Sequence, residues 1–386
     1  MSHEEEFAMK ILNINSYYYS SSVHRHLQKA LADRGIDSTT YVPLAKGYVP
    51  REDCKYGVEE RIDASECYEP KDRYAFHIKH HKILKDVLRR YDFGRFDCVH
   101  AHSLFSNGYI VLQIKEKAGL PYIVAVRDTD LNVFFRYMVY LRTLGVQILL
   151  QAEKVVFLSD SYRNQLVSQY VPDQHKRLVL EKSVVIPNGI DAFWIENTVF
   201  AGHKIDADNI RLIFAGQITK RKNLISVKKA CDLLMKEGVK IHFKIVGEAV
   251  DPKVMGRLLE AKFIEHVDRV KKEELMRLYR NSDIYVMPSI TETFGLSYAE
   301  AMSQGLPVVY TKGQGFDGQF EEGLVGYPVD CFNVEEIARR IQDIAGNYDE
   351  ISSFCARNAN RFDWTKISKD YEDLYREAGS RQDSCT

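Results

Sequence analysis

The chain of 386 residues lacks an excess of charge of either sign, a long apolar run and any paired-cysteine motif. With 53 Lys and Arg against 54 Asp and Glu, it has no overall basic field, so we predict that nucleic acid is not its main partner. No apolar run approaches the roughly 20 residues that cross a bilayer, and the acidic start, MSHEEEF, is unlike a secretion signal. The seven cysteines form no C-x-x-C pair, which indicates reduced thiols. These absences favour a cytoplasmic protein.

What the sequence does contain is two series of short, apolar, β-branched runs that alternate with segments of helical period. This alternation predicts an α/β fold built from βαβ units on mostly parallel sheets. Between the two series, residues 187–209 lack either period and carry the turn signal Asn188-Gly189. The expected strands are 10–14, 38–42, 98–102, 122–126, 155–159 and 183–187 in the first series, then 210–216, 240–247, 264–268, 283–289, 306–311 and 326–330 in the second.

Two domains follow from these series. We expect residues 1–190 to form a Rossmann-like domain with a disordered extension at 1–8, and 210–360 to form a second one. Residues 191–209 would be a linker. The tail, 361–386, has apolar residues at helical spacing, which predicts a final amphipathic helix that could pack back on the first domain.

Two glutamates flank a glycine-containing turn in the second series, SITETFGLSYAEA. Glu292 follows an expected strand, and the turn at Gly295 leads into an expected helix that carries Glu300. Because glycine lets backbone amides approach a ligand and a helix start adds partial positive charge, the turn suits a diphosphate. Two alternatives remain: Ser297 and Glu300 also fit a capping box, and Glu292 could be a solvated loop carboxylate.

Charged and titratable side chains follow two other expected strands. The loop AGQITKRKN places Lys220, Arg221 and Lys222 after the strand 210–216, where a loop lysine can neutralise a departing phosphate. The alternative is a surface loop of three solvated charges. In the first series FDCVHAHS ends with His100 and His102, and His102, last on the strand, is the better placed of the two to reach a ligand. The alternative is a buried structural histidine, the commoner role for a lone His.

The run from Ile264 to Asp330, with IPNGID at 186–191 and the loop 216–223, resembles the donor-domain signature of the family 4 retaining glycosyltransferases. Glu292 and Glu300 reproduce the E-x7-E spacing of that family. The resemblance implies the GT-B fold, two facing Rossmann-like domains with a central cleft. It also implies transfer of a sugar, with retention, from a nucleoside-diphosphate sugar (UDP or GDP) to an acceptor hydroxyl in glycan, polysaccharide or glycolipid synthesis.

The resemblance also assigns roles to residues by their positions. Glu292 would contact the donor sugar, Glu300 the ribose, and His102 would lie beside the donor sugar, while Lys222 would hold the diphosphate. The further donor-binding residues are Gln217, Arg221, Phe294, Gly295, Leu296 and Ser297. Gln217 stands where the family usually has arginine, and the usual Gly-Gly after the first strand is replaced by serines at 20–22. These departures favour the rival interpretation, a nucleotide-sugar-binding protein without transferase activity.

Two other motifs are interpreted as chance matches. Gly313 to Gly318 fits G-x-G-x-x-G, but only four residues separate it from Gly323, too few for the crossover helix of a dinucleotide site. Asp128-Thr-Asp130 fits a metal-binding D-x-D but lies in the domain opposite the expected phosphate site. We therefore predict no metal and no cofactor.

The segment 71–95 holds eight Lys or Arg against three Asp, with apolar residues along one helical face. Such a helix can lie against anionic lipid, which predicts peripheral contact with the inner face of a membrane near a lipid-linked acceptor. The alternative is a packed helix with a solvated basic face.

Overall fold

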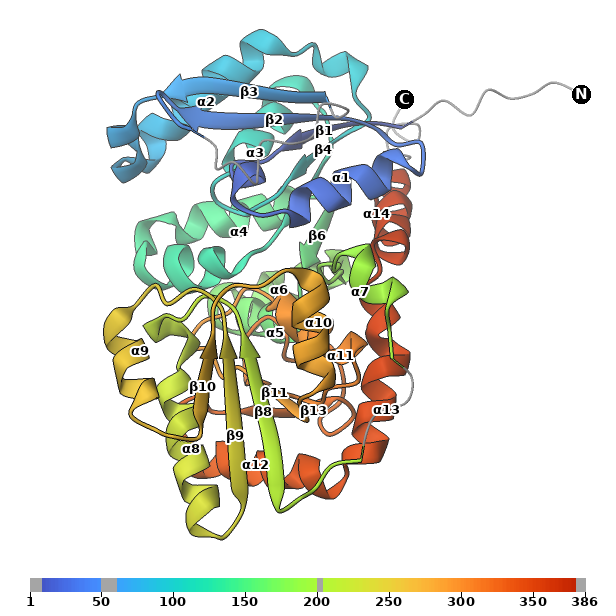
Figure 1. The fold of residues 1–386 in the computed structure, drawn as a ribbon. Helices are drawn as coiled ribbons and strands as arrows, with labels where there is room; N and C mark the ends of the chain where they lie inside the picture. Colours follow the sequence, from blue (N-terminus) through green and yellow to red (C-terminus); the bar gives the residue numbers. More distant parts are fainter. Residues whose placement is uncertain (1–8, 50–60, 200–203, 380–386) are drawn as a thin grey trace, which may run out of the picture. The chain divides into compact units, whose positions relative to one another are not determined.

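The structure, a computed structural model, describes residues 9–49, 61–199 and 204–379, so the expected extension 1–8 lies outside the described residues. Two parallel sheets with helices packed on their faces form two compact units (Figure 1). The first unit comprises the described chain up to Leu158, residues 162–189, and the chain from Trp364 onward. The second comprises Ser159–Ser161 and Ile190–Asp363.

In the described residues of the first unit, seven parallel strands follow the order β3-β2-β1-β4-β5-β6-β7. The strands are β1 (Lys10–Ile14), β2 (Asp37–Ala45), β3 (Arg61–Tyr68), β4 (Cys98–Ala101), β5 (Tyr122–Ala125), β6 (Lys154–Phe157) and β7 (Ser183–Val185). Its helices are α1 (Val23–Ala32), α2 (Phe76–Arg90), α3 (Gly108–Ala118), α4 (Arg142–Gln151), α5 (Asp160–Tyr170), α6 (Asp173–Lys182) and α14 (Trp364–Gly379). Short helical turns lie at Tyr18–Ser20 (η1), Pro70–Tyr74 (η3), Phe93–Arg95 (η4), Asp130–Phe135 (η5) and Val139–Leu141 (η6).

Strand β3 is absent from the sequence prediction. Within the described residues it forms the edge of the sheet and pairs with β2 alone, and most of its side chains are at least partly exposed. An edge strand of this kind carries charges such as Asp63 and Glu66 instead of an apolar run, and the pattern search therefore misses it.

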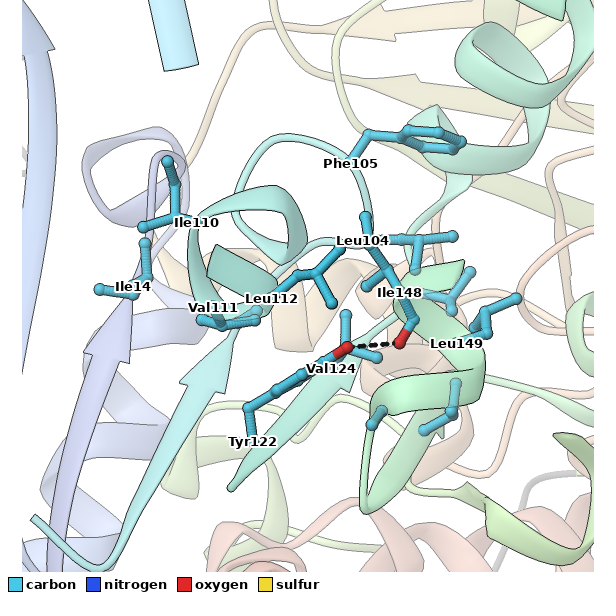
Figure 2. Close-up of a cluster of buried hydrophobic side chains, with 14 of the residues drawn as sticks. Ile14, Leu104, Phe105, Ile110, Val111, Leu112, Tyr122, Val124, Ile148 and Leu149 are labelled. Atoms are coloured by element: carbon cyan, nitrogen blue, oxygen red, sulfur yellow. Dashed lines mark hydrogen bonds between the residues drawn. The ribbon is translucent and has the colours of Figure 1, made fainter. Parts of the chain in front are cut away.

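The core of the first unit lies between this sheet and the helices α3 and α4 (Figure 2). Leu112, Val124 and Leu149 pack there together with the ring of Tyr122, and all are almost fully buried. The Tyr122 hydroxyl donates to the carbonyl of Ile148 at 2.6 Å, so this buried polar atom has a partner.

In the described residues of the second unit, six parallel strands follow the order β10-β9-β8-β11-β12-β13. They are β8 (Asn209–Ala215), β9 (Lys240–Val246), β10 (Ile264–Val267), β11 (Ile284–Val286), β12 (Val308–Thr311) and β13 (Gly326–Val329). The helices are α7 (Ala192–Glu196), α8 (Leu224–Lys236), α9 (Pro252–Leu259), α10 (Lys272–Arg280), α11 (Leu296–Ser303), α12 (Val334–Gly346) and α13 (Tyr348–Asn358), with short turns at Lys220–Lys222 (η7) and Ala359–Phe362 (η8). Numbered within the unit, the strand order is 3-2-1-4-5-6, which is that of a Rossmann sheet.

The described residues of the expected linker, 191–199 and 204–209, are grouped with the second unit. They include α7, whose Trp194 is buried with its ring 5.6 Å from that of Tyr279. The first part of the expected linker is therefore folded as a helix and packed through its tryptophan.

The final helix, α14, is part of the first unit, where it contacts α1. The Tyr375 hydroxyl lies 2.8 Å from Nδ1 of His100, and Arg34 pairs with Glu372 at 2.6 Å. The chain thus leaves the first unit at Gly189, forms most of the second, and re-enters the first at Trp364. In the parts of the chain that the structure describes, no helix combines the length and the apolar character needed to cross a bilayer.

Candidate functional site

The candidate site lies where the central strands β8 and β11 of the second sheet end. These two strands are neighbours. The strand that follows β8 in the chain, β9, lies on one side of the pair, and the strand that follows β11, β12, lies on the other. This edge is therefore a topological switch point. After β8 the chain passes through η7, and after β11 it passes through a loop that ends at Gly295. The carboxyl ends of neighbouring parallel strands share one edge, so the two loops come together there.

A buried ion pair joins these loops. Nζ of Lys222 lies 2.5 Å from Oε2 of Glu292, and the two side chains are 11% and 10% exposed. Arg221 Nη1 lies 3.3 Å from the same carboxylate oxygen and donates to the carbonyl of Thr291 at 2.6 Å. Ser289 Oγ also donates to this oxygen at 3.3 Å. The site therefore holds one carboxylate against two cations.

Lys222 is buried, in contrast to the solvated surface charge of the alternative interpretation. Burial lowers the pKa of Lys222, and the adjacent Glu292 carboxylate partly offsets this by raising it. The sulfur of Met287, at 3.3 Å from Nζ, covers another side of the ammonium group. Neither Lys222 nor Glu292 is therefore a solvated loop charge, and that alternative is wrong for both.

The buried Asn223 keeps η7 against the loop after β11. It has φ of 55°, and its side-chain amide donates to the carbonyls of Pro288, at 3.2 Å, and Cys331. Ser226 Oγ donates to Asn223 Oδ1 at 2.9 Å. An asparagine tolerates the left-handed region better than most residues, and its side chain here fixes the backbone that carries Lys222. Sequence reasoning missed this role, although an asparagine directly before a helix was a usable signal.

The Gly313-to-Gly318 motif has a role that sequence reasoning also missed. The backbone N–H of Glu292 donates to Oε1 of Gln314 at 2.8 Å, and the N–H of Gly315 donates to the carbonyl of Glu292 at 3.2 Å. A Cβ at Gly315 would lie 1.8 Å from the carbonyl oxygen of Thr293, so glycine is required for this approach. These two hydrogen bonds hold the loop that carries Glu292 in place, and we call this role of the motif the clasp.

The turn at Gly295 settles the capping-box question for this helix. Helix α11 begins at Leu296 with Gly295 as its N-cap, at φ of 79°, so Ser297 lies inside the first turn and cannot cap it. Its hydroxyl accepts instead from Tyr285 at 2.7 Å. A Cβ at Gly295 would lie 2.4 Å from the ring of Tyr298, which excludes other residues. The ring of Phe294 is buried and does not face a ligand. The backbone of this turn and the side chain of Ser297 lie near the helix start, where anions are favoured.

Glu300 lies one turn into α11, half-buried and near the charged pair Lys272–Asp191. Burial raises the pKa of Glu300 to about 7; Lys272 lowers it and Asp191 raises it. Asp191 also caps α7 by accepting from the N–H of Phe193 at 3.0 Å. Glu300 is therefore a carboxyl group whose charge changes near neutral pH.

Gln217 is exposed just after β8, and its amide donates to Glu248 at 3.4 Å. It lies in the same loop as Arg221 and Lys222.

His102 belongs to the first unit, at the end of β4 and beside β1, the switch point of that sheet. Its Nε2 lies 3.0 Å from Oδ1 of Asn13, and its ring stacks on His100 with centroids 4.0 Å apart. Burial first, then His100, His24 and Arg127, hold the pKa of His102 well below its usual value. This histidine is neutral at physiological pH.

Asp130, of the D-x-D motif, has a structural role. Its carboxylate accepts from the backbone N–H groups of Leu104 at 3.0 Å, Phe105 at 3.1 Å and Arg127 at 2.8 Å. Burial raises the pKa of Asp130 to about 6. Within residues 9–49, 61–199 and 204–379, no group of three or more His, Cys, Asp or Glu is arranged to hold a metal ion.

Comparisons with known proteins cover both units. Residues 21–192 match the family model "Glycosyltransferase Family 4", and residues 196–361 match "Glycosyl transferases group 1". The chain is 27% identical over 321 residues to a D-inositol 3-phosphate glycosyltransferase of Paenarthrobacter aurescens, covering 74% of each chain. It is 24% identical over 305 residues to the alpha-monoglucosyldiacylglycerol synthase of Acholeplasma laidlawii, covering 72% of this chain and 73% of that protein.

Solved structures show the same architecture. Sucrose-phosphate synthase from Thermosynechococcus elongatus has a TM-score of 0.71 at 17% identity, over 96% of this chain and 98% of that one. HepE from Anabaena, in complex with UDP-glucose, has a TM-score of 0.66 at 16% identity, over 95% and 99%. With its two parallel sheets, the protein has the GT-B glycosyltransferase fold. The chain belongs to the group 1 glycosyltransferases of family 4, which confirms the resemblance drawn from the sequence.

Proposed function

We propose that this glycosyltransferase moves a sugar from a nucleoside-diphosphate sugar to an acceptor hydroxyl with retention at the anomeric carbon. The observation that carries the proposal is the buried Lys222–Glu292 pair, with Arg221, at the switch point of the second sheet. A ligand with both a polyanionic part and a hydroxyl-rich part matches a site that presents cations and a carboxylate together.

The charges suggest a role for each side chain. Lys222, Arg221 and the start of α11 would hold the diphosphate and stabilise the charge it gains as it departs. Glu292 would accept hydrogen bonds from the sugar, and Glu300, when ionised, from the ribose hydroxyls. The acceptor oxygen would bond to the anomeric carbon as the bond to the phosphate breaks, and the acceptor proton would pass to the departing phosphate. His102, being neutral, would contribute a hydrogen bond and no charge.

Relatives and structural neighbours support a nucleotide-sugar donor. Neighbours of the same fold are described with UDP-glucose and with UDP and glucose, which favours UDP over GDP here. The names of two relatives specify an inositol phosphate and a glycolipid, which are consistent with a glycan, polysaccharide or glycolipid acceptor.

The rival is a protein that binds a nucleotide sugar without transferring it, and it is favoured by Gln217 in place of the usual arginine. Incubating the protein with UDP-glucose, UDP-N-acetylglucosamine and GDP-mannose, each with simple sugar and lipid acceptors, separates the two. We expect a product whose anomeric configuration, read by NMR, equals that of the donor, at a rate that EDTA leaves unchanged. A thermal shift with UDP but no product with any pair would favour the rival, and an inverted product would refute retention.

A further inference from the structure

Two segments of the first unit expose large apolar side chains. The first is η3 with the start of α2, and the second is η5 with η6. We call the following set the tyrosine patch: Tyr74, Ile78, Val133, Tyr137, Val139 and Tyr140, all exposed. Its three tyrosines are 78%, 68% and 68% exposed. Scattered apolar side chains are ordinary on a protein surface, but a concentration from neighbouring segments indicates an interaction site.

The two segments are joined beneath the patch. The ring of Phe76, at the start of α2, lies 6.1 Å from that of Phe134 in η5. Phe134 in turn stacks on the buried Phe105 with ring centroids 4.8 Å apart. Tyr74 and Ile78 flank Phe76 in the chain, and Val133 and Tyr137 flank Phe134, so the exposed side chains surround one common anchor. The ring contacts of Phe76 and Phe134 therefore hold the two segments next to each other.

The charge around the patch has one sign. Residues 73–85 contain four Lys or Arg and no Asp or Glu, and residues 131–152 contain two Arg and no Asp or Glu. Arg73 lies 4.6 Å from the centre of the Tyr74 ring, and Arg136 lies 5.3 Å from that of Tyr137. Guanidinium groups beside exposed tyrosine rings suit a boundary where an anionic layer meets an apolar one.

The acids that border these segments offset only part of this charge. Asp72 is buried and pairs with Lys82 at 2.6 Å, and the buried Asp130 is satisfied by backbone N–H groups. Farther along α2, more of the charge is paired: Arg90 pairs with Asp63 at 3.0 Å and with Asp86 at 2.7 Å, and Arg89 pairs with Asp86 at 2.9 Å. The basic segment expected at 71–95 is thus neutralised in its second half, and its net positive surface lies toward the patch.

We propose that the tyrosine patch docks on the headgroup region of an anionic lipid bilayer. The tyrosine rings would enter the interface while Arg73 and Arg136 contact lipid phosphates. A second copy of this chain is a poorer occupant, because a two-fold contact would bring the same arginines of both copies together. Docking does not require catalysis. Only its purpose, to bring the enzyme to a lipid-linked acceptor, rests on the proposed function.

Flotation of the full chain with phosphatidylcholine vesicles, with and without phosphatidylglycerol, tests the proposal. We expect binding only to the vesicles that contain phosphatidylglycerol, and weaker binding at high salt, because screening reduces the attraction. The double variant Tyr137→Ser/Tyr140→Ser should bind about tenfold more weakly, because two interfacial rings are lost. The double variant Arg73→Gln/Arg136→Gln should bind more weakly and show a flatter dependence on salt.

The matched control is Phe332→Ser, which removes an exposed ring, 64% exposed, from the second unit. It should bind as the parent does, and all variants should keep the parent's thermal unfolding and its activity on a water-soluble acceptor. Equal binding by parent and tyrosine variant, equal loss in the control, or no vesicle binding would overturn the proposal. So would a dimer, measured by light scattering, that the tyrosine variant abolishes. Vesicle binding without sugar transfer would leave the docking surface in place and refute the proposed function.

Discussion

The substitution Lys222→Met tests whether the buried ion pair serves the fold or the donor. Removing one partner of a buried pair leaves an uncompensated charge and costs about 3–5 kcal/mol. Here Arg221, at 3.3 Å, and Ser289, at 3.3 Å, still contact the Glu292 carboxylate. We therefore expect Lys222→Met to lower the free energy of unfolding by about 3 kcal/mol, the lower end of this range. Because the variant is unstable, its loss of activity alone would decide nothing.

The double variant Lys222→Met/Glu292→Gln separates the two roles. It removes both charges, and the methionine can pack against Met287, which already contacts Nζ at 3.3 Å. Neutral replacements of buried pairs often cost little, so stability should return to within about 1 kcal/mol of the parent. The transfer rate should stay at least about a hundred- to a thousandfold low, because losing one group that stabilises developing charge has that effect and the Glu292 contact to the sugar is weakened as well.

Urea unfolding and initial transfer rates, measured on the parent and both variants, complete the test. Lys220→Met is the matched control, because this lysine is exposed on the same turn, η7. It should change stability and rate little. If the double variant recovered rate together with stability, the pair would be structural and the donor diphosphate would bind elsewhere.

Four further predictions concern three other sets of groups. Affinity for UDP, by calorimetry, should rise as pH increases through about 7, where Glu300 ionises, and Glu300→Gln should bind with no such dependence; a parent affinity that is flat with pH would contradict this. Because its folded pKa is raised, Glu300 should also favour folding most in acid, and that contribution should fade as pH rises from about 4.5 to about 7. Gln314→Leu should lower kcat about tenfold by freeing the Glu292 loop, whereas Gln314→Glu, which keeps the acceptor oxygen, should retain more activity; equal loss in both would remove the clasp role. Burial lowers the pKa of His24 and His100 to about 3, so the folded state should lose stability as pH falls from about 6.5 toward 3. His24→Asn should lose less stability over this pH range, measured by urea unfolding at a series of pH values. An equal dependence of stability on pH in the parent and the variant would contradict this.

Most strands of the two sheets could be predicted from the sequence because they are buried on both faces and therefore appear as short apolar runs. Strand β3 could not, because an edge strand keeps charged side chains in water. Helix α7, inside the expected linker, could not be predicted for a related reason. The burial of Trp194 against Tyr279 is a tertiary contact that no local period reveals.

For the candidate site, the sequence places Lys222 and Glu292 each after its own strand. That these strands are neighbours follows from the sheet order, which the sequence does not state. The burial of Lys222 and the bond from the Glu292 N–H to Gln314 depend on that order too, since Gln314 comes from the loop after β12. A motif interpreted as a chance match therefore became part of the site only in three dimensions.

The return of the chain at Trp364 has a consequence for biosynthesis. Helix α14 is translated after all of the residues 190–363. The first unit therefore lacks its last helix during synthesis until the sheet of the second unit has been translated completely. During that interval the ring of His100 lacks the Tyr375 hydroxyl. We expect that a chain truncated by a stop codon after Asp363 still folds its second unit. Its first unit, which then lacks α14, should not fold.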